Sequence, residues 1–177
     1  SYILSKLFSE IHRALAYVGS SYEECHGMKA TLSLCWFTPG WMYFGHIGDS
    51  RIYHLLPGGG ITQLTHDHSY VGWLRRSGKI TEREARDHPR RNALNQALGA
   101  EHQFIEPQVG VLRCSPGDRF LLCSDGLTEN LWDRQLDEIV RTSETTAGAQ
   151  SLLREALARA GRDNITAMVV EVLAPNT

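Results

Sequence analysis

The chain has 177 residues, 42% of them hydrophobic, and its 18 basic and 20 acidic side chains give a formal net charge of −2. This length suits one domain with a sizeable core, and the balance of charge excludes the basic surface typical of nucleic-acid-binding proteins. No apolar run approaches the roughly 20 residues needed to cross a bilayer, and the first residues lack the layout of a secretion signal. We therefore expect a cytoplasmic protein with no membrane or nucleic-acid partner, and a monomer by default.

The amino-terminal third predicts a helix followed by antiparallel strands. Apolar residues recur at helical spacing from Ile3 to Val18, which predicts a helix almost from the first residue. Four short strands are predicted to follow, over 30–37, 41–47, 51–55 and 61–64. The Pro39-Gly40 turn makes the first two a hairpin.

The pattern is helical from 67 to 99. Asp67 is placed to cap the first helix of this segment, and Thr81 with Glu84 forms a predicted capping box. Pro89 breaks the pattern, and a second short helix is predicted over 92–98. A helical insert at about 66–99 therefore interrupts the strands.

The remaining elements are predicted as strands over 108–112 and 119–123, helices over 133–141 and 147–160, and a last strand over 164–173. Strands and helices form separate blocks instead of alternating, which favours an α+β class with antiparallel sheets covered by helices. No repeat or linker divides the chain, so residues 1–177 are expected to form a single domain.

Three aspartates are predicted to lie where strands end and the chain turns: Asp49, Asp125 and Asp163, each beside glycine or asparagine. Carboxylates held on a stiff backbone suit a hard cation such as Mg²⁺ or Mn²⁺, which takes oxygen ligands and keeps several waters. Taken singly, each aspartate also fits an ordinary turn or cap. Their order along the chain and their surroundings decide between the two interpretations.

Six further segments stand out along the chain: 27–32 (GMKATL), 46–53 (HIGDSRIY), 61–68 (ITQLTHDH), 88–92 (HPRRN), 116–127 (PGDRFLLCSDGL) and 162–166 (RDNIT). Together they span nearly the whole chain. In their order and at about their spacing, they resemble the motifs of bacterial metal-dependent protein serine/threonine phosphatases of type 2C. Six collinear motifs are far more specific than any one of them.

The resemblance implies an antiparallel β-sandwich flanked by helices, with a binuclear Mg²⁺ or Mn²⁺ centre. By motif position, Asp125 and Asp163 would be ligands of that centre, and Asp49 would help to hold a third metal. The implied reaction is hydrolysis of phosphoserine or phosphothreonine on proteins by a metal-activated water, without a protein nucleophile. The implied partners are phosphoproteins, among them a serine/threonine kinase or its targets.

The sequence also departs from the family pattern. The family begins with a phosphate-gripping arginine, an Asn-Glu-Asp segment and an Asp-Gly-x-Gly-Gly segment, and none of these precedes Gly27; Lys29-Ala30 replaces a usual glycine and threonine. We therefore expect the chain to be the carboxyl-terminal part of a catalytic domain, active in the full-length parent and inactive in isolation. A phosphatase-like binding module or an inactive fragment without turnover is the alternative hypothesis.

Other candidate sites are weaker. His66, Asp67 and His68 are consecutive, so their side chains do not converge on one ion in an extended segment, and a loop at the helix entry is the favoured interpretation. Ser124 lacks the Gly-x-Ser-x-Gly setting of a hydrolase nucleophile. Arg90 and Arg91 belong to a basic stretch of the insert that is either a solvated face or a docking surface for an anionic phosphopeptide.

Overall fold

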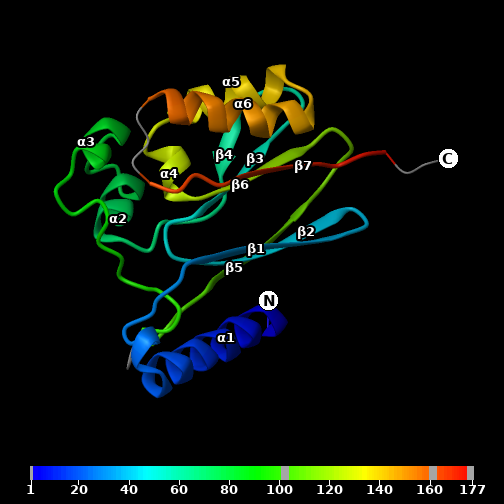
Figure 1. Cartoon of the computed structure of the whole chain (residues 1–177). Coiled ribbons are helices and arrows are strands. Elements are labelled where there is room, and N and C mark those ends of the chain that lie inside the picture. Colours follow the sequence, from blue (N-terminus) through cyan, green and yellow to red (C-terminus); the bar gives the residue numbers. More distant parts are fainter. Residues whose placement is uncertain (1, 101–103, 160–162, 175–177) are drawn as a thin grey trace. The chain divides into compact units, whose positions relative to one another are not determined.

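A computed structural model describes residues 2–100, 104–159 and 163–174. The chain forms two compact units, Ser1–Asp49 with His66–Arg113, and Ser50–Thr65 with Cys114–Thr177. Each unit contains one antiparallel sheet and its own helices (Figure 1). No helix in the described ranges is long and apolar enough to cross a membrane.

The first unit is built on a three-stranded sheet in the order β1-β2-β5. Its strands are β1 (Leu32–Thr38), β2 (Trp41–Ile47) and β5 (Gln108–Arg113), and its helical elements are α1 (Tyr2–Ser21), η1 (Glu23–Cys25), α2 (Tyr70–Arg76) and α3 (Glu82–Arg86). β1 and β2 pair along their whole length, with Leu32 opposite Ile47 and Thr38 opposite Trp41. The predicted hairpin is therefore confirmed.

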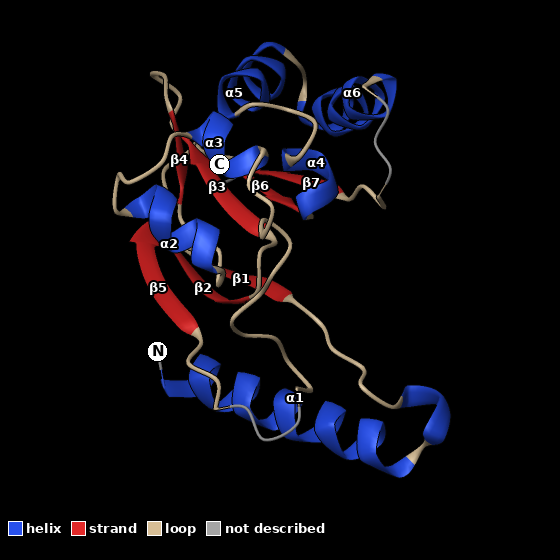
Figure 2. Ribbon diagram, turned by 90° about the vertical axis from the view of Figure 1, so that its left-hand side faces the viewer, coloured by secondary structure: helices blue, strands red, loops and turns tan. Residues whose placement is uncertain are grey.

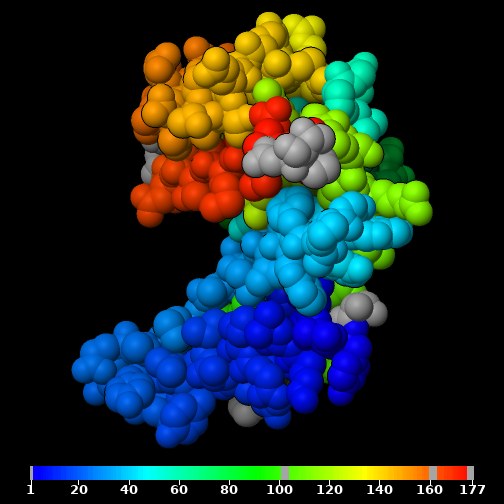
Figure 3. All heavy atoms as spheres, turned by 90° about the vertical axis from the view of Figure 1, so that its right-hand side faces the viewer, coloured from blue at the N-terminus to red at the C-terminus, as the bar shows by residue number. Residues whose placement is uncertain are grey.

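Helix α1 lies along one face of this sheet (Figure 2). Phe8 of α1 is buried with Ile47 and Leu98, and a Cβ atom at Gly45 of β2 would lie 2.5 Å from the Phe8 ring. Glycine at position 45 thus allows the helix to approach the strand closely. Much of α1 is exposed (blue in Figure 3). Tyr2 and Tyr17 are among its exposed side chains.

The second unit is built on a four-stranded sheet in the order β4-β3-β6-β7. Its strands are β3 (Arg51–Leu55), β4 (Ile61–Gln63), β6 (Arg119–Cys123) and β7 (Ala167–Glu171), and its helices are α4 (Asp125–Thr128), α5 (Asp133–Thr142) and α6 (Thr145–Ala158). Side by side, α5 and α6 cover one face of the sheet (Figures 1 and 2). Buried side chains of the strands and helices, including Leu121, Leu127, Leu136 and Leu152, form one core.

Arg119 fixes the end of α5 to β6. Its Nη1 atom donates to the carbonyl oxygens of Val140, at 2.5 Å, and of Ser143, at 2.8 Å. Its Nη2 atom lies 3.3 Å from the Glu171 carboxylate on β7. Because the last carbonyls of a helix lack partners within the helix, this side chain satisfies them and ties helix to sheet.

Two sequence predictions in the insert are wrong. No helix spans 92–98, since the Leu98 N–H and carbonyl pair with the backbone of Ala30 at 2.8 and 3.0 Å. Asp67 does not cap α2; the Ser69 hydroxyl does, accepting from the Gly72 N–H at 2.9 Å. The capping box of Thr81 and Glu84 at the start of α3 is confirmed.

The carboxyl-terminal elements differ from their predicted bounds by a few residues. β7 (Ala167–Glu171) is shorter at both ends than the predicted strand over 164–173. α6 starts two residues before the predicted helix, at Thr145. Ala160 of that predicted helix and Arg162 of the last motif lie outside the described residues.

Candidate metal centre

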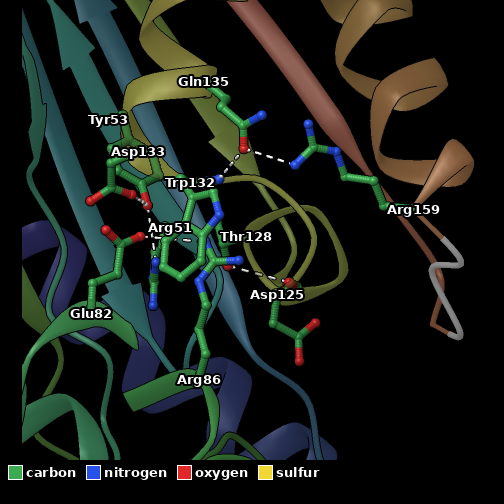
Figure 4. A network of polar contacts seen from close by, with 10 residues as sticks. All are labelled: Arg51, Tyr53, Glu82, Arg86, Asp125, Thr128, Trp132, Asp133, Gln135 and Arg159. Carbon is green, nitrogen blue, oxygen red and sulfur yellow. Dashed lines mark hydrogen bonds and ion pairs between the residues drawn. The ribbon is translucent and has the colours of Figure 1, made fainter. Parts of the chain in front are cut away.

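Asp125 lies at the junction of β6 and α4. Cys123 before it and Leu127 after it are both buried in the core, so the backbone on each side is anchored. The Gly126 N–H donates to Asp125 Oδ1 at 2.8 Å. In Figure 4 the Asp125 carboxylate points away from the polar contacts of the neighbouring α5.

Asp163 lies just before β7 and is solvent-exposed. The Asn164 N–H donates to Asp163 Oδ1 at 2.7 Å, which fixes one carboxylate oxygen. Two residues later, Ile165 packs against the core of the second unit and anchors the segment.

Ser124 and Gly126 join the segments that carry these two aspartates. The Ser124 Oγ atom accepts from the Thr166 N–H at 3.0 Å and donates to the Asn164 carbonyl at 3.2 Å, and the Ser124 N–H donates to the Thr166 carbonyl at 3.1 Å. A Cβ atom at Gly126 would lie 2.5 Å from the Asn164 carbonyl oxygen. Asp125 and Asp163 are therefore held at the same end of the β6-β7 pair.

This arrangement fits a hard cation. Each carboxylate uses Oδ1 for a hydrogen bond from the next residue, and within the described chain neither Oδ2 accepts a hydrogen bond. Among residues 2–100, 104–159 and 163–174, no group of three or more His, Cys, Asp or Glu side chains is arranged to hold a metal ion. Two carboxylates with several waters are, however, a usual way to bind Mg²⁺ in proteins.

A polar network supports the adjoining start of α5 (Figure 4). Arg51 of β3 donates to the Tyr53 hydroxyl, which donates to Asp133 Oδ1, both at 3.0 Å. Burial raises the pKa of Tyr53, so the phenol stays protonated and remains a donor. This link fixes the amino-terminal end of α5 to the sheet.

Asp49 belongs to the first unit and follows β2 through Gly48. Gly48 has φ +110°, and a Cβ atom there would overlap the Thr31 side chain, so only glycine fits. The Gly48 N–H donates to His68 Nδ1 at 3.2 Å, while the Gly48 carbonyl accepts from the His68 N–H at 2.7 Å and from His46 Nε2 at 3.1 Å. Two histidines thus bind the peptide groups that precede Asp49.

Both histidine rings favour the neutral form. Burial, followed by the neighbouring His68, lowers the pKa of His46 to about 4. Burial, followed by the positive charge of Arg76, lowers the pKa of His68. The two rings lie with their centroids 5.0 Å apart.

Arg90 and Arg91 are both exposed in the first unit. The Arg90 guanidinium lies 5.3 Å from the ring centroid of Tyr70, and the Tyr70 ring in turn stacks on Trp73 at 6.0 Å. The Arg91 N–H donates to the His88 carbonyl. The turn after Pro89 therefore presents two exposed cations, one of which, Arg90, lies beside the Tyr70 ring.

Sequence reasoning missed the supporting residues of both sites. The sequence presents Ser124 only as a weak candidate nucleophile and Asn164 only as a motif position, yet the Ser124 hydroxyl donates to the Asn164 carbonyl and joins two loops about 40 residues apart in the chain. For His68 the sequence predicts only a place in the loop at the helix entry. The sequence signal for Ser124 is its place beside Asp125, since short polar side chains often bond to nearby backbone groups.

Comparison with known proteins decides the family. The model of the family described as "Protein phosphatase 2C" matches residues 2–160. This chain belongs to the protein phosphatase 2C family. The resemblance inferred from the motifs is thereby confirmed.

Named relatives are serine/threonine phosphatases. The chain is 34% identical over 174 residues to serine/threonine protein phosphatase PstP of Mycobacterium tuberculosis, covering 97% of this chain and 33% of that protein. It is 35% identical over 169 residues to serine/threonine phosphatase stp of Listeria monocytogenes, covering 95% of this chain and 66% of that protein. The chain thus spans between a third and two thirds of the length of these relatives.

A solved structure agrees with the fold. The catalytic domain of PstP in complex with two manganese ions superposes with a TM-score of 0.84 at 33% identity, covering 97% of this chain and 72% of that one. The predicted α+β class, with antiparallel sheets flanked by helices, is confirmed.

Proposed function

We propose that the full-length protein carrying this chain hydrolyses phosphoserine and phosphothreonine esters in proteins, with water activated by a binuclear Mg²⁺ or Mn²⁺ centre. Asp125 and Asp163 would be ligands of that centre, and Asp49 would help to hold a third metal. The observation that carries the proposal is the link through Ser124 and Gly126, which holds the two carboxylate segments at one end of β6 and β7.

Each residue at this end has a role that its contacts support. Asp125 and Asp163 supply negative charge, and the N–H of the next residue orients each carboxylate. When bound, two dications supply a water acidic enough to act as a nucleophile and offset the charge on the phosphoryl oxygens. The Ser124 hydroxyl already makes two hydrogen bonds to the segment after Asp163, which favours a structural role over that of a nucleophile.

The proposed substrates are phosphoproteins, including a serine/threonine kinase or its targets. The names of the PstP and stp relatives support this class. Arg90 and Arg91 are exposed and cationic, which suits docking of an anionic phosphopeptide outside the reacting centre.

Metal removal tests the proposal. We expect the full-length protein to hydrolyse p-nitrophenyl phosphate only when Mg²⁺ or Mn²⁺ is added, because in this proposal the bound metals make the attacking water acidic enough to act as a nucleophile. The measurement is turnover after dialysis against EDTA, followed by titration with each metal. Zinc serves as the control, since the described site offers oxygen ligands and not the nitrogen and sulfur ligands that zinc favours. Undiminished turnover in excess EDTA would exclude the metal assignment.

A further inference from the structure

The peptide groups on both sides of Gly48 are held by two histidines that the proposed chemistry does not use. The Gly48 carbonyl accepts two hydrogen bonds, one from the backbone N–H of His68 and one from the ring atom Nε2 of His46. The Gly48 N–H donates to the ring atom Nδ1 of His68. Glycine lacks a Cβ atom, so its backbone has unusual freedom to rotate, and Gly48 adopts a positive φ. These three contacts remove that freedom immediately before Asp49.

The contacts also fix the proton positions on both rings. His68 Nδ1 accepts from the Gly48 N–H, so the ring proton of His68 lies on Nε2. His46 Nε2 donates to the Gly48 carbonyl, so His46 Nδ1 accepts from the Ser33 hydroxyl, 2.9 Å away on β1. Each ring therefore presents one defined hydrogen-bonding atom to Gly48.

Contacts from other elements hold the histidines themselves. Ser33 lies opposite His46 in the β1-β2 register, so the sheet orients the buried His46 ring. The His68 carbonyl accepts from the Asn95 N–H at 2.7 Å, and the nearby His66 N–H donates to Gln108 Oε1 at 2.6 Å. Residues of both the sheet and the insert therefore hold His46 and His68 in place.

We propose that His46 and His68 are positioning residues that fix the Gly48-Asp49 peptide and thereby direct the Asp49 carboxylate toward a metal. The carbonyl of Gly48 lies in the same peptide plane as the nitrogen and Cα atoms of Asp49, so two donors on that oxygen set where the Asp49 side chain begins. The inference rests on the proposed function, in which Asp49 helps to hold the peripheral metal. Neither histidine is a ligand in this account.

Matched substitutions distinguish the loss of a hydrogen bond to Gly48 from the loss of the histidine side chain as such. His68→Leu removes the acceptor for the Gly48 N–H, whereas His68→Asn keeps an acceptor at about the place of Nδ1. His46→Leu removes the donor to the Gly48 carbonyl, whereas His46→Gln keeps a donor near the place of Nε2. Circular dichroism and thermal melting show which variants remain folded.

The readout is Mn²⁺ binding to the metal-free full-length protein, with free Mn²⁺ counted by electron paramagnetic resonance at room temperature. We expect the leucine variants to lower the Mn²⁺ affinity of the weakest site by about tenfold or more, which is the usual loss when a supporting partner of a metal ligand is removed. The asparagine and glutamine variants are expected to retain most of the affinity, and the tighter sites are expected to be unchanged. In an Asp49→Asn background, His68→Leu is expected to cause no further loss.

Two results would overturn the positioning role: normal Mn²⁺ binding by the folded leucine variants while Asp49→Asn weakens it, or equal weakening by His68→Leu with and without the Asp49 carboxylate. Unchanged binding by Asp49→Asn would overturn the inference together with the third-metal part of the proposed function. That last result would leave the assignment of Asp125 and Asp163 intact, so the two failures are distinguishable.

Discussion

Gly126 shows how a missing side chain sets the spacing of two functional loops. A Cβ atom there would lie 2.5 Å from the Asn164 carbonyl oxygen, and a backbone oxygen held by Ser124 cannot move aside at little cost. The neighbouring residues on the two segments are Asp125 and Asp163. Glycine is therefore required at this position for the carboxylates to keep their present separation.

His46 is expected to make stability depend on pH. Its pKa is lowered to about 4 in the folded protein from 6.5, so between these values the unfolded chain binds more protons and stability falls as pH falls. We expect the folded state to lose about 2 to 3 kcal/mol from this residue between pH 7.5 and pH 4.5. Urea unfolding at both pH values, in the presence of a chelator, measures this change in the free energy of unfolding.

The control for this prediction is His46→Gln, which cannot be protonated in this range. Carboxylates also titrate at acidic pH, so the quantity of interest is the difference in pH dependence between the two proteins. If the wild type and His46→Gln lose the same stability on acidification, His46 is not protonated preferentially in the unfolded state, and burial does not lower its pKa in the folded protein.

At the scale of elements, the turn after α3 is predicted to contribute to the turnover of large anionic substrates only. Changing Arg90 and Arg91 together to alanine should lower kcat/KM for a phosphopeptide by about tenfold at low salt, because the exposed cations attract an anionic chain. Turnover of p-nitrophenyl phosphate should change little, since the charges act outside the reacting centre. Added salt should reduce the difference.

A matched control for the arginine pair removes the same charge from other exposed arginines of the first unit, Arg13 and Arg113. Steady-state assays of both double variants on both substrates decide the matter. An equal loss on the two substrates would mean that Arg90 and Arg91 support folding or the metal site and not docking.

Local patterns predicted the strands better than the insert. β2, β3 and β6 have the predicted bounds, because alternation and turn residues act within a few positions. The segment 92–98 has a helical pattern, but its Leu98 pairs with Ala30 and its Leu94 with Ser69, and no local pattern contains that information. Likewise Ser69 and Asp67 are both good caps, and tertiary packing selects the serine.

The sequence predicts the proposed metal ligands, but it does not predict the residues that hold those ligands in place. Asp125 and Asp163 stood out because each begins a turn beside glycine or asparagine within a collinear motif. The bonds that Ser124 makes to the segment after Asp163, and those of His46 and His68 to Gly48, depend on how distant strands are brought together. Single-residue patterns carry no record of such contacts.

At the scale of the whole molecule, the order of motifs was the strongest predictor. Each motif alone matches ordinary turns, but the six together led to the family that matches residues 2–160. Segregated blocks of strands and helices gave the α+β class for a physical reason, since antiparallel hairpins need no crossover helices. The single-domain organisation and the monomeric state remain predictions.

The most direct test of the central claim is turnover of p-nitrophenyl phosphate with Mn²⁺ by Asp125→Asn and Asp163→Asn variants of the full-length protein. Loss of a supporting partner alone costs about 10- to 100-fold at metal sites, so loss of a ligand charge should cost more than about 100-fold. Asp49→Asn should cost less, and Asp137→Asn on α5, which removes the same charge outside the site, should be close to wild type. Folded Asp125→Asn and Asp163→Asn proteins with wild-type turnover would contradict the account.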